Sequence, residues 1–283
     1  FEIKERTWDI SATSSDSIQA TLSTEGILTI SGSGNMISTW TINNKTPWYA
    51  IRERIKSVKI EDGVTNIGRL AFNECTELTS IEISNSVTNI GHSAFFKCSS
   101  LKSIEIKGSV ITIGNDAFFR CSSLENIYVY ASNPNYVGVN GVLYNKEKTK
   151  IIKYPEGKQD AEYKISSDVT SIGDSAFKYC DSLTNIIIPS SVTSIGNGAF
   201  DNCDSLTIMC KSGTTAETYA IENDIKYIID DIVPTVKLNT QVNVGTITIT
   251  VESKDETAGV DESSYKYYIK EENGEYIEGV KSS

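Results

Sequence analysis

Hydrophobic and polar positions along the chain follow a pattern that returns every 23 residues. The pattern reads Val-Thr-x-Ile-Gly-x-x-Ala-Phe-x-x-Cys-x-x-Leu, and its copies begin at Val64, Val87, Val110, Val169 and Val192. A unit of this length cannot bury its apolar side chains alone, so neighbouring units must cover one another. The sequence therefore predicts a solenoid over residues 51–229, and we expect its function to lie on an extended surface.

A short segment with alternating apolar and polar positions precedes each copy. Because successive side chains of a strand point to opposite faces, its flanking apolar residues should face the core and its middle residue the solvent. One such strand per coil stacks into a parallel sheet along one face of the solenoid. The segments are Val58–Ile60, Ile81–Ile83, Ile104–Ile106, Ile127–Val129, Tyr163–Ile165 and Ile186–Ile188.

The second half of each copy predicts a turn. The Val-Thr-x-Ile piece is extended and ends at a glycine, which indicates a positive φ or close backbone packing. Asp, Asn or Ser often precedes Ala-Phe, which resembles a helix N-cap. Ala, Phe and Cys at i, i+1 and i+4 then share one face of a single helical turn. We expect the phenylalanines to form a buried aromatic column. They are Phe72, Phe95, Phe118, Phe177 and Phe200.

The cysteines follow the same period, apart from an extra Cys210 near the end. Their spacing lacks the short pairs of a zinc site, so we expect no metal. Disulfides stay open, because neighbouring strands lie ~5 Å apart, within the Cα separation that a disulfide bridges. One cysteine per coil at a core position also suits a small buried hydrophobic residue, and we favour free thiols. The periodic members are Cys75, Cys98, Cys121, Cys180 and Cys203.

The array is interrupted at about residues 130–162, because the copies at Val110 and Val169 are 59 residues apart. Two apolar runs within this segment flank a polar Lys-Glu-Lys-Thr turn, which predicts a β-hairpin. The hairpin is either an ornament on the solenoid, which we favour, or an arm that contacts a ligand.

The two ends of the chain do not repeat. Residues 1–50 predict a β-rich N-terminal cap, and we expect their tryptophans, Trp8, Trp40 and Trp48, to cover the first coil rather than to bind a glycan. Residues 213–229 predict one short helix and a closing strand. Residues 230–283 contain alternating strands at 246–251 and 265–270 that resemble the start of a bacterial Ig-like or fibronectin-like module. They supply about half of the ~100 residues of such a sandwich, so we expect an incomplete module or, alternatively, a small β-module.

Composition narrows the classes of partner. A formal charge of −11 and a pI near 4.7 disfavour nucleic acid and polybasic contacts with membranes. No apolar run approaches the ~20 residues of a membrane span. The first ten residues lack the apolar core of a signal peptide, which fits a mature or trimmed chain.

The single histidine limits catalytic chemistry. A Ser-His-Asp site, a Cys-His site or a histidine-containing zinc site would all need His92. This residue occupies a variable position of the repeat, and we expect it to lie at the surface. The sequence therefore predicts no catalytic residue and no cofactor.

The repeat resembles the BspA-type, or treponemal-type, leucine-rich repeats of bacterial surface proteins, whose consensus runs Ile-Gly-x-x-Ala-Phe-x-x-Cys-x-x-Leu-x-x-Ile-x-Ile. The similarity covers Ile51–Ile229 and rests on five copies in register. It implies a leucine-rich-repeat solenoid of parallel strands and short helical turns. It also implies a secreted or surface-attached protein connected with adhesion, and it supplies no catalytic residues.

The outward middle positions of the stacked strands form the predicted binding surface. Solenoids commonly bind partners on a concave sheet, and exposed aromatic or apolar residues would anchor such an interface. The alternative is a merely solvated sheet face. The positions are Lys59, Glu82, Glu105, Tyr128, Lys164 and Ile187.

These observations predict a monomeric, adhesin-like protein, secreted or displayed on the bacterial cell surface. Its expected partner is a host extracellular protein or a bacterial surface protein, without nucleic acid and without insertion of this chain into a membrane. Two alternatives remain: a structural spacer that binds nothing, and a glycan-binding module that uses the tryptophans.

Overall fold

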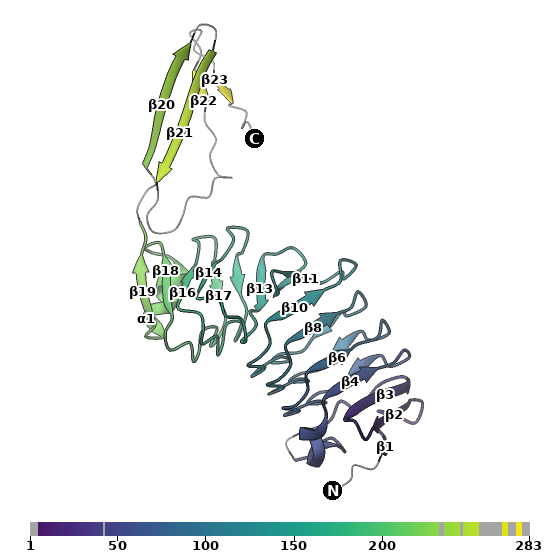
Figure 1. Ribbon diagram of the computed structural model, residues 1–283. Helices are drawn as coiled ribbons and strands as arrows, with labels where there is room; N and C mark the ends of the chain where they lie inside the picture. Colours follow the sequence, from purple (N-terminus) through teal and green to yellow (C-terminus); the bar gives the residue numbers. More distant parts are fainter. Residues whose placement is uncertain are drawn as a thin grey trace. The chain divides into compact units, whose positions relative to one another are not determined.

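The computed structural model describes residues 5–41 and 43–231 in full, and the backbone of four further strands between residues 235 and 278. Its internal contacts divide the chain into two units, Phe1–Ile229 and Asp230–Ser283. The first unit is a solenoid in which the strands of successive coils lie side by side (Figure 1). The leucine-rich-repeat solenoid expected from the sequence is thereby confirmed.

The N-terminal region is an antiparallel sheet that continues into the solenoid. β1 (Arg6–Asp9), β2 (Ser17–Leu22) and β3 (Ile27–Ser33) pair in this order, and β3 then pairs in parallel with β4 (Ser57–Ile60). Alternate residues of β2 and β3 are buried, so one face of the sheet joins the core. The 3-10 helix η1 (Tyr49–Arg54) precedes the first coil.

The tryptophans of this region pack over the first phenylalanine of the array. Trp48 is fully buried, its ring stacks on Phe72 with a centroid distance of 6.3 Å, and its Nε1 donates to the Ala71 carbonyl at 3.0 Å. Trp40 is buried against Trp48, and Trp8 is half-buried with its ring 6.1 Å away. The expectation that they cover the first coil is confirmed.

Each regular coil contributes one longer strand and one strand of two residues, as the alternation of the sequence predicts. After β4, the longer strands are β6 (Ser80–Glu82), β8 (Ser103–Ile106), β10 (Asn126–Val129), β14 (Glu162–Lys164), β16 (Asn185–Ile187), β18 (Thr207–Cys210) and β19 (Lys226–Ile229). The short strands are β5 (Asn66–Ile67), β7 (Asn89–Ile90), β9 (Thr112–Ile113), β15 (Ser171–Ile172) and β17 (Ser194–Ile195). All pairings between strands of successive regular coils are parallel.

The turn after each glycine is a series of i→i+3 hydrogen bonds rather than an α-helix. Ala94 N donates to Gly91 O at 3.2 Å, while Ser93 and Lys97 have φ values of 52° and 58°. The residue expected as an N-cap is therefore left-handed, a conformation in which Asn and Asp are enriched. Gly91 has no positive φ, but a Cβ there would lie 2.6 Å from Arg69 N. Close packing of coils, not φ, requires this glycine.

Aromatic rings run through the core as expected. Successive coils contribute Phe72, Phe95, Phe118, Tyr154, Phe177 and Phe200, all buried. Tyr154 was not anticipated: it occupies the phenylalanine position of the interrupted coil, and its ring stacks on Phe177 at 5.0 Å. Stacks on either side of the interruption have similar spacings of 5.1 to 5.8 Å. The column thus extends the packing of one coil to the next on each side of the interruption, and among the described residues no ring contact joins Phe118 to Tyr154.

The cysteines form a buried column of free thiols. Sγ of Cys98 donates to the Phe72 carbonyl at 3.2 Å, and Sγ of Cys121 donates to the Phe95 carbonyl at 3.1 Å. Burial raises the pKa of both thiols well above the usual value. They act as small hydrophobic residues with one weak hydrogen bond each, as the favoured alternative predicts.

The insertion is built into the solenoid rather than projecting from it. β11 (Tyr136–Val139), β12 (Val142–Asn145) and β13 (Lys150–Lys153) pair antiparallel in this order, and β13 pairs in parallel with β15. The expected hairpin is β12 and β13. Leu143 and Ile151 are fully buried. The buried apolar side chains of the solenoid form two clusters that meet at this insertion.

The solenoid ends with a helix and a strand, as the sequence predicts. α1 (Thr215–Glu222) begins at Thr214, whose hydroxyl accepts from Glu217 N at 3.4 Å. Ala216 and Ala220 face the core, and β19 follows. This arrangement closes the last coil.

The second unit contains two antiparallel strand pairs. β20 (Thr235–Asn243) pairs with β21 (Thr246–Lys254), and β22 (Tyr268–Lys270) pairs with β23 (Tyr276–Glu278). Part of the strand expected at 265–270 lies outside the described residues. The Ig-like module stays a prediction.

Candidate functional site

The six residues predicted to bind a ligand lie on the solvent-facing side of the longer strands, which we call the sheet face. Strand register places them side by side as Lys59–Glu82, Glu105–Tyr128 and Lys164–Ile187. Five of them are exposed and Ile187 is half-buried. The structure therefore brings them together in adjacent pairs, and their role in binding stays a prediction.

The insertion divides this surface. Ile127 N of β10 donates to Gly141 O in the turn between β11 and β12, at 2.9 Å. This turn lies beside β10, and the longer strands resume in a separate sheet at β14. The predicted residues up to Tyr128 thus belong to one half of the sheet face, and Lys164 and Ile187 belong to the other.

A charged and aromatic cluster marks the first half. Lys107 Nζ lies 3.0 Å from Glu105 Oε2 and donates to the Tyr130 hydroxyl at 2.9 Å. Burial disfavours the charge on Lys107, but hydrogen bonds to Tyr130 and Glu105 and the attraction of the Glu105 carboxylate outweigh it and raise the pKa of Lys107. The lysine therefore stays charged and fixes both neighbours in place.

Two exposed tyrosines lie next to this ion pair. Tyr128 is 52% exposed and Tyr130 is 45% exposed. Sequence reasoning missed Tyr130 and Lys107, although the period of two in a strand puts them on the same face as Tyr128 and Glu105. The cluster of Glu105, Lys107, Tyr128 and Tyr130 is the most chemically varied part of the sheet face.

The second half of the sheet face is more apolar. Ile187 pairs with Met209, and Met209 pairs with Ile228 of β19, so three apolar side chains continue one column. Ile228 is exposed, and the other two are half-buried. Strand alternation could have identified these residues too, since Met209 and Ile228 are the outward positions of their strands. They extend the predicted site beyond Ile187.

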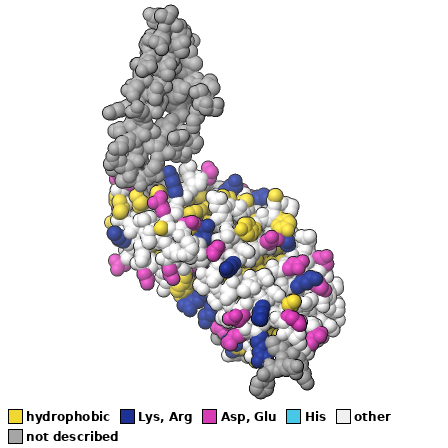
Figure 2. Space-filling view, viewed as in Figure 1, with side chains coloured by type: hydrophobic (Ala, Val, Ile, Leu, Met, Phe, Trp, Pro, Cys, Tyr) yellow, Lys and Arg dark blue, Asp and Glu magenta, His cyan; other side chains and the backbone are white. Residues whose placement is uncertain are grey.

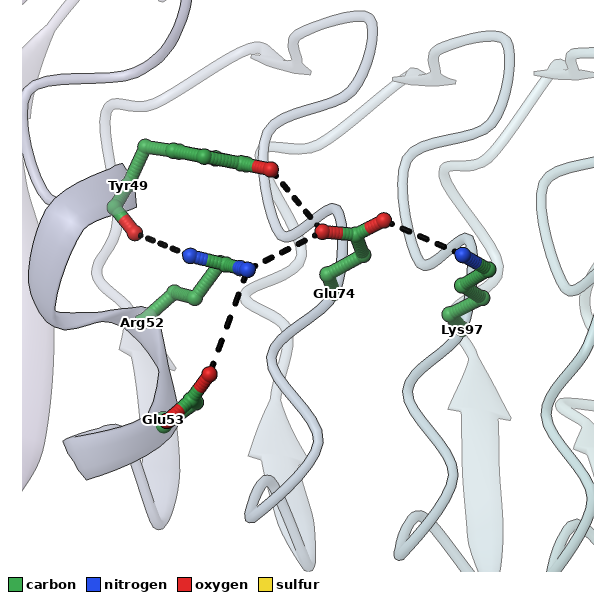
Figure 3. Close-up of polar contacts among 5 residues, drawn as sticks. All are labelled: Tyr49, Arg52, Glu53, Glu74 and Lys97. Carbon is green, nitrogen blue, oxygen red and sulfur yellow. Dashed lines mark hydrogen bonds and ion pairs between the residues drawn. The ribbon is translucent and has the colours of Figure 1, made fainter.

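A second polar cluster ties η1 to the first coils. The Glu74 carboxylate accepts from the Tyr49 hydroxyl at 2.9 Å, from Arg52 at 3.1 Å and from Lys97 at 3.1 Å (Figure 3). Burial of Glu74 opposes ionisation, but hydrogen bonds from Tyr49 and Lys97 and the charges of Lys97 and Arg52 lower its pKa. Arg52 also lies 3.9 Å from the exposed Glu53. This network stabilises the junction between η1 and the first coils.

Side chains that could support other chemistry do not converge. His92 is exposed at its variable repeat position. Within residues 5–41 and 43–231, no group of three or more His, Cys, Asp or Glu could hold a metal ion. Binding of a glycan by the tryptophans is ruled out for Trp40 and Trp48, because their indole rings are buried and cannot stack on a sugar ring.

The surface has no region of a single charge sign on the face drawn in Figure 2, where acidic and basic side chains are interspersed. In the part of the chain that the structure describes, no helix is long and apolar enough to cross a bilayer. The exposed tyrosines and the Glu105–Lys107 ion pair of the sheet face are groups that can contact the surface of a partner without any chemical reaction.

Comparison with solved structures finds bacterial leucine-rich repeat proteins. A leucine-rich repeat protein from Eubacterium ventriosum is 29% identical, with 75% of this chain and 73% of that chain covered and a TM-score of 0.47. A leucine rich cell surface protein from Faecalibacterium prausnitzii is 23% identical, covering 74% and 77%, with a TM-score of 0.44. The pneumococcal vaccine antigen PcpA is 19% identical, covering 71% and 72%, with a TM-score of 0.46.

Among curated protein sequences, no match is found. The BspA type leucine rich repeat region matches residues 48–160 and 156–227, in six copies. Solenoids of this type are typically scaffolds without catalytic activity, and the proteins that carry them are typically extracellular or surface-associated. Since the matched residues make up more than half of the sequence, the chain belongs to the BspA-type leucine-rich repeat family.

Proposed function

We propose that this chain is a secreted or surface-displayed binding protein that engages a protein partner over the first half of the sheet face, as an adhesin does. The observation that carries the proposal is the pair of exposed rings, Tyr128 and Tyr130, beside the Glu105–Lys107 ion pair. Tyrosine is enriched at interfaces and at binding hot spots.

The rigidity of the support favours binding. Ile127, which lies between the outward residues of β10, is fully buried, and β10 pairs with β8 over four residues. The rings are therefore held in place before a partner arrives, and little conformational freedom is lost on association. The buried residues beneath the sheet face thus hold its exposed side chains in position before a partner binds.

The charges on this surface indicate the chemistry of the partner. Glu105 is paired with Lys107, while Glu82 has no ion-pair partner among the described residues. The whole chain carries a net charge of −11. A partner that presents Lys or Arg beside an apolar patch would pair with Glu82 and cover the rings. Its association rate should fall as salt is added, because screening weakens steering between charged surfaces.

The test is binding of the full chain to a panel of immobilised host matrix proteins and bacterial surface proteins, at low and high salt. For a partner that binds saturably, the Tyr128→Ala variant should bind at least tenfold more weakly, since hot-spot tyrosines are worth about 2 kcal/mol. The triple variant Glu82→Gln, Glu105→Gln, Tyr128→Ala should lose binding altogether.

A matched control carries substitutions of exposed acidic residues away from the sheet strands, Glu77→Gln and Asp204→Asn. It should bind as the unmodified chain does, and all variants should unfold at similar urea concentrations. Unchanged binding by the triple variant would place the interface elsewhere. If the chain binds none of the immobilised proteins, the alternative of a structural spacer is favoured.

A further inference from the structure

The coil that contains the insertion is two residues shorter than a regular coil at one point. Ile151 pairs with Ile172, and Tyr154 N donates to Ala176 O, which is the bond that phenylalanines make in regular coils. In the regular coil, Gly173–Ala176 separate the isoleucine from Phe177. In the inserted coil, only Ile152 and Lys153 lie between Ile151 and Tyr154. The Gly-x-x-Ala turn is therefore incomplete here.

A cavity of about 430 Å³ lies where the missing part of this turn would be. We call it the seam cavity. Its walls combine apolar side chains, such as Phe118 and Leu143, with polar ones, such as Asn115, Asn197 and Lys153. Its volume falls in the range of sites that hold small ligands.

Main-chain groups in one wall of the seam cavity lack the partners that their counterparts have. One coil earlier, Ser93 N donates to Asn115 O at 3.0 Å, and Phe95 N donates to Ala117 O at 2.9 Å. The equivalent donors at the seam are the amides of Asp116 and Phe118, and no hydrogen bond from either is present among the described residues. Both residues line the cavity.

An unpaired acceptor lies in the same wall. The Ile90 carbonyl accepts from Gly114 N at 2.8 Å, whereas its counterpart, the Ile113 carbonyl, has no donor from the inserted coil among the described hydrogen bonds. Ile113 also lines the cavity. Two donors and one acceptor therefore face the seam in the pattern that a Gly-x-x-Ala segment satisfies between regular coils.

The next main-chain amide along this wall, that of Arg120, does have a hydrogen-bond acceptor. Arg120 N, the next donor, is satisfied by a side chain, because Glu156 Oε1 accepts from it at 3.0 Å. Glu156 is buried and forms an ion pair with Lys153 at 3.0 Å. A buried carboxylate thus replaces one missing carbonyl, and no group among the described residues replaces the other two.

We propose that the seam cavity binds a short peptide of a partner protein through its main chain, in the turn conformation of a regular coil, with glycine first and small side chains after it. This inference rests on the proposed function, because it names a second contact for a protein partner. In the regular coil the two acceptors are Asn115 and Ala117, residues i and i+2, and Asp116 between them has a φ of 56°. A peptide that adopts this turn presents its carbonyls at the same spacing, so it can accept from both amides at the seam.

Glycine is required at the first position for the same reason as in regular coils. A Cβ at Gly114 would lie 2.4 Å from His92 N, and a Cβ at Gly196 would lie 2.4 Å from Asp174 N. A peptide that occupies the equivalent place beside Gly114 meets the same close backbone. Phe118 is buried, so pairing its amide recovers a hydrogen bond that a buried donor otherwise lacks, and the amide of the exposed Asp116 gains a second bond beside it.

The probe is a capped tetrapeptide, acetyl-Gly-Asp-Ser-Ala-amide, which repeats the sequence of residues 173–176. Titrated into the isotope-labelled full chain, it should give saturable NMR shifts at the amides of Asp116 and Phe118 and slow their hydrogen exchange. A peptide with valine in place of glycine should bind at least tenfold more weakly. Equal binding of both peptides, or no shift at either amide with millimolar peptide, would overturn the proposal.

A pair of variants locates the site on the chain. Asn115→Trp places a large ring at the cavity wall and should weaken binding of the tetrapeptide at least tenfold. His92→Trp makes the same change at the equivalent position of the preceding coil, away from the cavity, and should leave affinity within twofold. Equal affinities of the two variants would refute the assignment. If the peptide does not bind while binding of the protein partner still depends on Tyr128, the seam proposal alone is refuted. If the peptide binds while binding of the protein partner does not depend on Tyr128, the sheet-face proposal alone is refuted.

Discussion

The aromatic column makes a quantitative prediction about stability. Phe95 is fully buried, and its ring stacks on Phe72 at 5.4 Å and on Phe118 at 5.8 Å. Replacing a buried phenylalanine with alanine costs about 3–5 kcal/mol of unfolding free energy, depending on how far the cavity collapses. Rings above and below Phe95 prevent collapse, so Phe95→Ala should lie near the upper end, at about 4–5 kcal/mol.

Phe118 provides a comparison within the same column. Its ring stacks on Phe95, but its other side lines the seam cavity, so part of its packing is already absent. Phe118→Ala should cost about 3 kcal/mol, roughly one aromatic pair less than Phe95→Ala, since such a pair is worth about 0.5–1.5 kcal/mol. The half-buried Phe96 is the matched control, and Phe96→Ala should cost about 1 kcal/mol.

The measurement is urea unfolding followed by circular dichroism, with the slope against urea compared between variants. Fluorescence of the three tryptophans, Trp8, Trp40 and Trp48, reports on the N-terminal end of the same column. If Phe95→Ala costs less than about 1 kcal/mol, or less than Phe118→Ala, the rings do not carry the packing between coils in the way described.

Three other changes test separate parts of the structure. The six buried thiols should resist a thiol reagent at pH 8 and react when the protein unfolds. Cys203 should react first, because it is the most exposed of the six and burial raises its pKa only to about 11. Rapid reaction of all six thiols in the native state would contradict their burial. Glu74→Gln should cost about 1 kcal/mol at pH 7. Because the folded pKa of Glu74 lies below its usual value, this contribution exists above the usual value and disappears as pH falls through the folded one, so the stabilities of variant and unmodified chain should converge at acid pH; Glu77→Gln is the control. Lys153→Met leaves the Glu156 carboxylate buried without its cation and should cost about 3–5 kcal/mol in urea unfolding, more than Glu156→Gln, which keeps an acceptor for Arg120 N; a loss below about 1 kcal/mol for Lys153→Met would show that the ion pair does not matter for stability.

Much of this molecule could be predicted because its interactions are local and repeated. A strand alternates its faces whatever its surroundings, so the outward positions of Lys59, Glu82 and Glu105 follow from sequence alone. The same rule applied two residues further on would have found Lys107 and Tyr130. The buried tryptophans also followed from a general need, since the first coil of a solenoid must be covered.

What escaped prediction depends on contacts between coils. Tyr154 takes a phenylalanine position without the Ala before it or the Cys after it, so only the register of β13 against β15 reveals the substitution. The shortened turn beside it, and hence the seam cavity, is visible only once that register is known. Likewise, the need for Gly91 comes from Arg69 in the preceding coil rather than from its own φ.

The division of the buried side chains into two clusters has a mechanical consequence. Coils of a solenoid hold only their neighbours, and at the insertion two of the usual bonds between coils are missing, those from Asp116 and Phe118. Under tension applied along the array, the first break should come here, while the coils on each side stay assembled. If residues 133–168 then unravel, their 36 residues can extend to roughly 120 Å at about 3.4 Å per residue, and the gain in length is this value less the distance that they span when folded. The insertion thereby acts as a built-in extension point of the solenoid.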